Sequence, residues 1–259
     1  MELTPTTRHR LPGSGRRLFV KWDDSFEYAG IRGGKVRACL HLATGATGLI
    51  TASARKSPQA QIVARIANSL GIPARLHMPR GADTPEMTDV RAHGGEIVQH
   101  KAGYNNVIIR RATDDVAARA GTGWVYIPFG MESTDAMECT VPQVASIAAL
   151  RPTPRRVVVV VGSGMTACAI LHGLRRLGSP IPVVGVSIGA NPRKRIARHA
   201  PPFWWEQLTL IDHVKKQPYH EATHAHIDGR VLDPIYEAKC LEYLEDGDLF
   251  WVVGIRTGL

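Results

Sequence analysis

Five consecutive valines, Val157–Val161, constrain the fold of this 259-residue chain more than any other segment. A run this apolar and β-branched forms a strand that is buried on both faces, which is typical of the centre of a parallel sheet. Apolar runs elsewhere alternate with stretches of helical periodicity about 10–15 residues long, which indicates strands joined by helical crossovers. We therefore expect an α/β protein with parallel, doubly wound sheets.

The expected strands and helices alternate along most of the chain. Strands are expected at residues 18–22, 48–52, 74–78, 95–98, 124–127, 156–161, 183–188 and 249–254. Helices are expected at residues 35–43, 59–70, 85–93, 107–120, 140–150 and 167–177. The first 17 residues, rich in Thr, Pro, Gly and Arg, are expected to form a loose arm. The short apolar run of residues 18–22, which ends at Asp23-Asp24, is expected to be an edge strand followed by a turn.

Composition places the chain among ordinary globular proteins. It is 44% hydrophobic and 21% charged, which excludes disordered and fibrous classes. No apolar run approaches the roughly 18–20 residues of a membrane span, and the polar, basic start does not resemble a secretory signal, so we expect a cytoplasmic protein without a membrane partner. The four cysteines show neither a CxxC pair nor the spacing of metal ligands, so reduced thiols are expected.

Charge is the feature that composition leaves unexplained. The chain holds 32 Lys and Arg against 23 Asp and Glu, a formal charge of +9. Part of the excess lies in residues 191–199, which precede Phe203-Trp204-Trp205. Cations beside aromatic side chains can follow phosphates and stack unpaired bases, so DNA is a candidate partner. A solvated basic helix above packed aromatics gives the same pattern, and both interpretations stay open.

The valine strand runs directly into a glycine loop, Gly162-Ser163-Gly164-Met165-Thr166. Glycines let the backbone turn tightly, and the start of the following helix attracts phosphate. With Ala167 the loop also matches the dinucleotide fingerprint, although no acidic residue follows about 20 positions later. The basic residues 193–195 could accept a ribose phosphate instead, so NADP and a plain glycine turn remain alternatives to the favoured phosphate site.

Five stretches in a fixed order carry a family resemblance. They are Phe19–Asp24, Gly33–Arg37, Gly162–Thr166, Asp233–Lys239 and Arg256–Gly258. Their sequences are similar to the motifs "VKRDD", "GGNKTRK", "GSGGT", "DPVYEGK" and "HTGG". Together they resemble fold-type II pyridoxal-phosphate enzymes, and most closely the 1-aminocyclopropane-1-carboxylate deaminase and D-cysteine desulfhydrase group. The resemblance covers residues 18–259.

The resemblance implies a compact version of the tryptophan synthase β-like fold, with pyridoxal 5′-phosphate as the cofactor. In such enzymes the chain leaves the larger domain after the catalytic lysine and returns to it before the phosphate loop. We therefore expect a larger cofactor-binding domain of residues 1–42 and 129–259 and a smaller domain of residues 43–128. The family also implies a homodimer.

The resemblance assigns the cofactor-binding residues. Lys35 would hold the cofactor as a Schiff base. Glu237 would face the pyridine nitrogen, and Thr257 is the alternative partner of that nitrogen in the desulfhydrases. The phosphate would lie on Gly162, Ser163, Gly164, Met165 and Thr166, with Met165 where the family has Gly. An exposed lysine and a solvent-facing glutamate are the plainer interpretations of Lys35 and Glu237.

Two further residues are assigned catalytic roles by the resemblance, and one family position is altered. Tyr236 would act as an acid or base near the reacting carbon, and Ser57 would meet the substrate carboxylate at a helix start. A core tyrosine and a helix N-cap are the plainer interpretations. Pro58 replaces the asparagine that bonds the cofactor's phenolic oxygen, which leaves Gln59 or Gln61 as candidate replacements.

The resemblance thus implies an enzyme acting through an external aldimine at the α-carbon of an amine or amino acid, as a lyase, deaminase or decarboxylase. One alternative is the same chemistry on an amino-acid-modified base in DNA, as in the thymine hypermodification of some bacteriophages. Another is a basic nucleic-acid-binding module that has lost catalysis. The histidines at 220, 224 and 226 match no zinc spacing, so no metal is expected.

Overall fold

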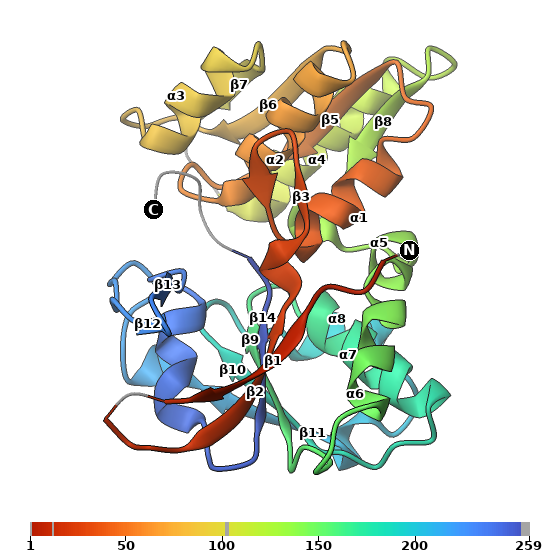
Figure 1. The fold of residues 1–259 in the computed structure, drawn as a ribbon. Coiled ribbons are helices and arrows are strands. Elements are labelled where there is room, and N and C mark those ends of the chain that lie inside the picture. Colours follow the sequence, from red (N-terminus) through yellow and green to blue (C-terminus); the bar gives the residue numbers. More distant parts are fainter. Residues whose placement is uncertain (1, 12, 102–103, 255–259) are drawn as a thin grey trace. The chain divides into compact units, whose positions relative to one another are not determined.

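A computed structural model describes residues 2–11, 13–101 and 104–254 of the chain (Figure 1). The chain divides into two compact units. The first unit holds Met1–Phe26, Arg32–Gly34 and Met137–Leu259, and the second holds Glu27–Ile31 and Lys35–Ala136. The expected domain boundaries at residues 42/43 and 128/129 stay a prediction.

The sheet of the first unit places the valine run at its centre. Its strand order is β1-β2-β14-β9-β10-β11. The strands are β1 (Thr6–Arg10), β2 (Arg17–Trp22), β9 (Val157–Val161), β10 (Val183–Ser187), β11 (Leu208–Asp212) and β14 (Leu249–Val252). All five valines of β9 are buried, and β9 pairs in parallel with both β14 and β10. The prediction of a central parallel strand is confirmed.

The N-terminal segment is not a loose arm, and the prediction that β2 lies at the sheet edge is wrong. Strand β1 pairs antiparallel with β2 from Thr6 to Arg10, so β1 itself forms the edge. Just before β1, the Thr4 N–H donates to Gln143 Oε1 at 2.8 Å. The buried Lys21 ammonium donates to the Thr4 carbonyl at 2.6 Å. Polar anchors, rather than apolar alternation, hold this strand in place.

Helices and short elements cover the sheet of the first unit. Helix α7 (Met165–Arg176) packs on β9 and β10, and α8 (Arg193–His199) packs on α7 (Figure 1). The remaining elements of residues 137–254 and of the chain start are η1 (Asp23–Ser25), η3 (Val141–Val144), α6 (Ala145–Ala148), η4 (Trp204–Glu206), η5 (His213–Lys215), β12 (His226–Ile227), β13 (Arg230–Val231) and η6 (Glu237–Tyr243). Helix α5 (Thr134–Glu138) spans the change from the second unit to the first.

The long helix expected at residues 140–150 is replaced by the 3₁₀ turn η3 followed by the short helix α6. Val141, Val144 and Ile147 recur every three residues, and all three are buried. A spacing of three aligns side chains along a 3₁₀ helix, whereas an α-helix turns them progressively away from one another. Apolar burial therefore favours the tighter turn over the expected helix.

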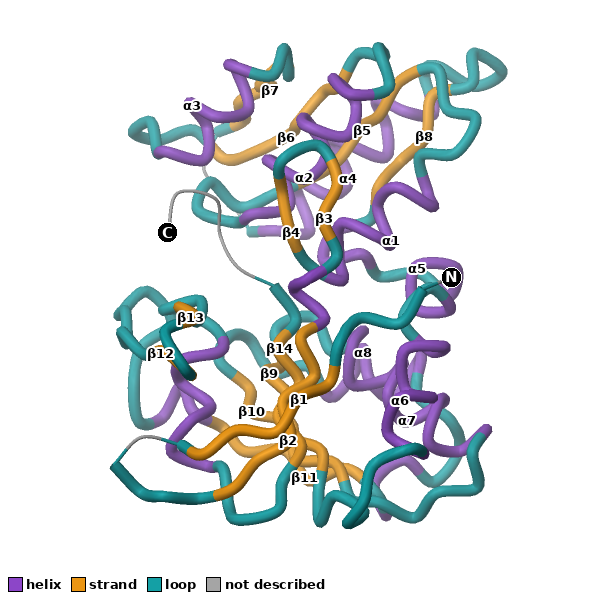
Figure 2. The backbone as a smooth tube through the Cα atoms, in the orientation of Figure 1, coloured by secondary structure: helices purple, strands orange, loops and turns teal. Residues whose placement is uncertain are grey.

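The second unit contains a fully parallel four-stranded sheet in the order β7-β6-β5-β8 (Figure 2). The strands are β5 (Gly48–Ala52), β6 (Ala74–Pro79), β7 (Glu96–His100) and β8 (Trp124–Ile127). The helices are α2 (Pro58–Ser69), α3 (Pro85–Ala92), α4 (Asn105–Ala117) and α1 (Gly34–Leu42), of which only the first residue belongs to the first unit. The hairpin β3 (Glu27–Tyr28) and β4 (Ile31–Arg32) and the short turn η2 (Phe129–Met131) complete the elements of residues 27–136. The predicted class of parallel α/β sheets is confirmed.

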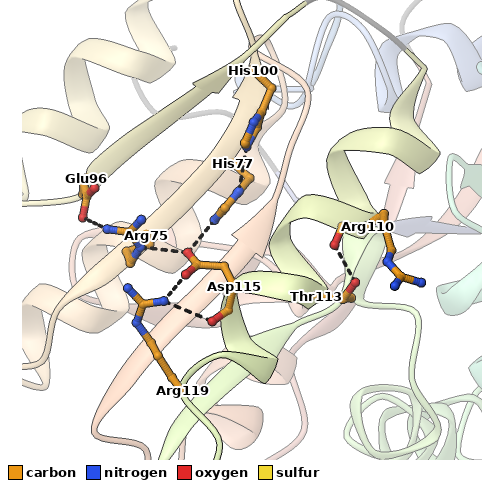
Figure 3. A network of polar contacts seen from close by, with 8 residues as sticks. All are labelled: Arg75, His77, Glu96, His100, Arg110, Thr113, Asp115 and Arg119. Atoms are coloured by element: carbon orange, nitrogen blue, oxygen red, sulfur yellow. Dashed lines mark hydrogen bonds and ion pairs between the residues drawn. The ribbon is translucent and has the colours of Figure 1, made fainter.

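A polar network connects β6 and β7 to α4 in the second unit (Figure 3). Asp115 on α4 accepts from Arg75 Nε and from His77 Nε2, each at 2.8 Å, and it also pairs with Arg119. Burial, with help from Arg75 and Arg119, lowers the pKa of His77 to about 4. The imidazole is therefore neutral at pH 7, and its Nδ1 accepts from His100 Nε2 at 2.8 Å.

None of the described helices has the length and apolarity that crossing a bilayer requires.

Candidate active site

The loop between β9 and α7 is tightly packed on the helix that follows the next strand. Gly164 has φ +94°, and a Cβ added there would lie 2.8 Å from Ile196 Cγ1 of α8. Both the backbone angle and the close approach require glycine. The Cys168 N–H donates to the Gly164 carbonyl at 3.0 Å, so helical bonding begins at the loop itself. The loop thus presents the start of a 12-residue helix, where backbone N–H groups and the helix dipole favour an anion.

The other loop residues fit this arrangement. Met165, the first residue of α7, is buried within the core cluster of the first unit, so it can contribute only its backbone. Ser163 and Thr166 are half-buried. Five residues of the expected phosphate site therefore lie together at one helix start, although their role stays a prediction.

Tyr236 lies against the first glycine of the same loop. A Cβ added at Gly162 would lie 3.4 Å from Tyr236 Cε1. The Tyr236 hydroxyl is 2.8 Å from the hydroxyl of Tyr219, and the two rings meet edge to face. The turn before Tyr236 is held by Asp233, whose Oδ1 accepts from the Tyr236 N–H at 3.0 Å. Tyr219 was missed by the sequence analysis, because no quoted motif contains it and only the fold brings it to Tyr236.

Glu237 carries an unsatisfied buried carboxyl oxygen. Its residue exposure is 2%, and its Oε1 accepts from the Val253 N–H at 3.0 Å and the Gly254 N–H at 3.3 Å. Within the described part of the chain, Oε2 is buried and has no hydrogen-bond partner. Burial raises the pKa of Glu237 well above its usual value, and the nearby Asp233 carboxylate raises it further. Glu237 Oε2 can therefore accept a hydrogen bond from a donor or face a positive charge.

The double glycine before Lys35 is fixed to the end of β14. The Gly34 N–H donates to the Val253 carbonyl at 2.9 Å. Gly33 has φ +134°, and an added Cβ would lie 3.1 Å from the same carbonyl oxygen. A Cβ at Gly34 would lie 2.2 Å from Asp23 Oδ2, so neither position admits a side chain. Lys35 is the next residue and is half-buried. The glycine before it bonds the carbonyl of Val253, and the N–H of Val253 donates to Glu237 Oε1.

Ser57 is the N-cap of α2 in the second unit. Its backbone is extended, and its Oγ accepts from the Gln59 N–H at 3.3 Å. Pro58 occupies the first helical position, where a missing N–H costs nothing. The structure thus gives Ser57 a capping role, and its expected contact with a substrate carboxylate stays a prediction.

The two glutamines considered as replacements for the missing asparagine are both engaged elsewhere. Gln59 Nε2 donates to Thr51 Oγ1 and to the Pro128 carbonyl, each at 2.8 Å, and its Oε1 accepts from the Gly130 N–H at 2.6 Å. The side chain of Gln61 hydrogen-bonds Asp89. Gln59 therefore fixes the turn after β8, and the replacement of the asparagine by either amide stays a prediction.

Thr257 and the stretch Arg256–Gly258 lie outside the described residues. His220, His224 and His226 are all exposed. In residues 2–11, 13–101 and 104–254, no group of three or more His, Cys, Asp or Glu side chains is arranged to hold a metal ion.

Comparisons with known proteins bear on the family and the fold of the chain. Residues 4–245 match the model of a family described as pyridoxal-phosphate dependent enzymes. No curated protein sequence matches the chain. A solved structure of an ACC deaminase homologue superposes with a TM-score of 0.79, at 23% identity, over 98% of this chain and 90% of that one.

More distant structures share the same fold. The diaminopropionate ammonia lyase of Escherichia coli, in its apo form, gives a TM-score of 0.69 at 15% identity, over 98% of this chain and 83% of that one. The serine racemase of maize gives 0.66 at 17% identity, over 99% of this chain and 89% of that one. At these identities the likeness shows the fold alone, and it confirms the predicted fold-type II architecture.

Proposed function

Because the chain belongs to the pyridoxal-phosphate dependent enzyme family, we propose that it acts at the α-carbon of an amine or amino acid, as a lyase, deaminase or decarboxylase. The observation that carries the proposal is the unpartnered, buried Oε2 of Glu237. A buried polar atom without a partner costs about 1–3 kcal/mol, so a ligand group that meets it is strongly favoured. Family membership also favours an enzyme over a nucleic-acid-binding module without catalysis.

The residues of the first unit fit the cofactor at both of its ends. The glycine loop would bind the phosphate at the start of α7. The crowding at Gly164 excludes a side chain there, so the backbone N–H groups of the loop stay accessible to the phosphate. Glu237 offers a buried carboxyl group to the pyridine nitrogen, where a negative charge favours the protonated ring. Bound pyridoxal phosphate supplies an electron sink that withdraws electrons from the α-carbon of an attached amine.

Two side chains of this protein would then move protons. Lys35 would hold the cofactor and, once displaced by the substrate amine, act as the base toward the α-carbon. Tyr236 would present a hydroxyl beside the loop, where its bond to the Tyr219 hydroxyl at 2.8 Å fixes its orientation. Ser57 would meet the substrate carboxylate at the start of α2.

The test is α-hydrogen exchange and product formation by the full chain saturated with pyridoxal phosphate. D- and L-amino acids and simple amines are incubated in D₂O, and NMR follows loss of the α-hydrogen while ammonia, 2-oxo acids and CO₂ are measured. We expect turnover that falls at least about tenfold in Glu237→Gln, because the neutral amide cannot stabilise the protonated ring. The exposed Glu27→Gln is the matched control and should not differ from wild type. A cofactor-loaded chain that exchanges and converts none of these compounds would contradict the proposal.

A second candidate is the same chemistry on an amino-acid-modified base in DNA. It is supported by the exposed cations of α8, the helix whose Ile196 approaches the phosphate loop. Incubation with DNA that carries aminoacylated thymine, followed by nucleoside mass analysis, tests it. An unchanged nucleoside mass under conditions in which free amino acids are converted would exclude this substrate. The predicted homodimer remains a proposal that sedimentation velocity can test.

A further inference from the structure

Two aromatic side chains stand out of the surface just after α8. Phe203 is 61% exposed and Trp205 is 59% exposed, whereas Trp204 between them is partly buried against the core of the first unit. The Phe203 and Trp205 rings meet edge to face with centroids 5.6 Å apart. Phe203 has φ +61°, a left-handed backbone that bulky residues rarely adopt. The turn thus holds an aromatic pair outward at a strained position.

Several basic residues lie close to this pair in the sequence, on and beside α8. Arg193, Lys194 and Arg198 of α8 are exposed, and Arg175 at the end of α7 donates to the Pro202 carbonyl at 3.3 Å. Residues 189–211 contain four Lys and Arg and one acidic residue, Glu206, a formal balance of 4 − 1 = +3. In the described part of the chain, no carboxylate pairs with Arg193 or Lys194. Their charges are therefore available to an external anion.

We propose that these residues form a binding site for a single-stranded polynucleotide. This α8 platform consists of Arg193, Lys194, Phe203 and Trp205. Cations that follow a backbone of phosphates and aromatic rings that accept stacked bases are the two requirements of such a site. A duplex keeps its bases stacked on one another, so it can use only the cations.

The charge of the platform argues for a polyanion rather than for a second copy of this chain. A two-fold interface places the same patch against itself, so the exposed Arg193 and Lys194 would meet the same two cations of the second copy. A polynucleotide instead neutralises each cation and releases the counterions bound to its phosphates. The inference does not rest on the proposed function, because binding on α8 uses neither Lys35 nor the cofactor.

The position of the platform gives it a functional context. Ile196, on the buried face of α8, is the residue that an added Cβ at Gly164 would meet at 2.8 Å. The Cys168 thiol of α7 also lies 4.0 Å from the Ile196 carbonyl oxygen. The platform is therefore built on the helix that packs on the phosphate loop, within the same unit.

Fluorescence anisotropy with a labelled 12-nucleotide oligo-dT tests the proposal on the full chain supplied with pyridoxal phosphate. Titrations at several KCl concentrations between 20 and 200 mM give the salt dependence. We expect binding whose log K falls with log salt at a slope of roughly −0.7 for each phosphate contacted, hence about −1.4 for two cations. A duplex of the same length should bind more weakly. Oligo-U of equal length shows whether RNA or DNA is the tighter ligand.

Variants separate stacking from charge. Trp205→Ala should weaken oligo-dT binding about 5- to 150-fold, since stacking on an aromatic ring supplies that much per base. Phe203→Gly should also weaken binding while leaving the thermal stability equal or higher, because glycine relieves the left-handed backbone. Arg193→Glu should weaken binding and flatten the salt slope. The matched controls are Tyr104→Ala, an aromatic that is 84% exposed, and Lys215→Glu, whose side chain is 83% exposed.

Several outcomes overturn the proposal. Absence of oligo-dT binding at 20 mM KCl does so directly. Equal losses of oligo-dT affinity in Arg193→Glu and Lys215→Glu would show that only the net charge of the protein matters. If Trp205→Ala leaves oligo-dT binding unchanged and duplex binds as tightly as single strand, base stacking does not contribute to binding. A dimer that dissociates in Trp205→Ala, in a chain that binds no oligo-dT, would assign the surface to a second copy.

Discussion

Replacement of Gly164 by alanine perturbs the glycine loop, residues 162–166, at the point where an added Cβ would be most crowded. The residue has φ +94°, so a side chain there meets a backbone penalty of about 1–2 kcal/mol. The new methyl group would lie 2.8 Å from Ile196 Cγ1, and overpacking of this kind costs about 1–3 kcal/mol. The two effects together predict a loss of about 2–5 kcal/mol. For a domain of this size that lowers the Tm by roughly 4–20 °C.

Gly178 provides a matched control at the other end of the same helix. It also has positive φ, at +60°, but no atom lies within 4 Å of an added Cβ. Gly178→Ala therefore meets the backbone penalty alone, about 1–2 kcal/mol. Circular dichroism gives the Tm of both variants, and visible absorbance gives their affinity for pyridoxal phosphate. We expect only Gly164→Ala to lose affinity, by about tenfold or more. Equal Tm values, or unchanged affinity in Gly164→Ala, would refute the reasoning.

Three further predictions concern titration and buried hydrogen bonds. Because the pKa of Glu237 is raised on folding, the unfolded chain alone releases a proton above pH 4.5, and stability of the cofactor-free protein falls as pH rises. Glu237→Gln should remove that fall in urea denaturation, and a stability difference independent of pH would contradict it. The pKa of His77 is instead lowered from 6.5 to about 4, so stability should fall by about 3 kcal/mol between pH 6.5 and 4. In His77→Gln this fall should disappear, and an unaltered pH curve argues against a neutral, buried imidazole. Gln59→Ala removes three hydrogen bonds and should lose about 2–4 kcal/mol in the same assay, whereas a loss below about 1 kcal/mol would show that the turn after β8 does not depend on it.

The fold was largely predictable because the spacing of apolar residues indicates its central strands and helices. The five valines of Val157–Val161 predict a strand buried on both faces, and the alternation of strands with helices predicts a parallel sheet. The expectation of two parts came from the order of the family motifs. The parts that differ depend on contacts made at long range. Strand β1 is held by Thr4, Lys21 and Gln143, which are far apart in the sequence and show no apolar pattern. The turn at Val141–Val144 follows a spacing of three that also fits one face of an α-helix.

The candidate site was predictable where residues sit in a motif and unpredictable where the fold alone unites them. The glycine loop, Tyr236 and Glu237 were named from sequence, and the structure brings the loop and Tyr236 into contact. Tyr219 reaches Tyr236 from 17 residues earlier in the chain, with no signal except the fold. The structural role of Gln59 was also hidden, because its partners lie on β5 and beyond β8.

Covalent attachment of the cofactor would identify the lysine that holds it. The full chain is incubated with pyridoxal phosphate, reduced with borohydride and digested with trypsin. A modified Lys35 blocks cleavage, so the account predicts a phosphopyridoxyl group on the peptide Gly33–Arg37, which is absent from Lys35→Ala. A label on another lysine, or no label together with no visible absorbance of bound cofactor, would contradict the assignment of this chain as a pyridoxal-phosphate enzyme acting through Lys35.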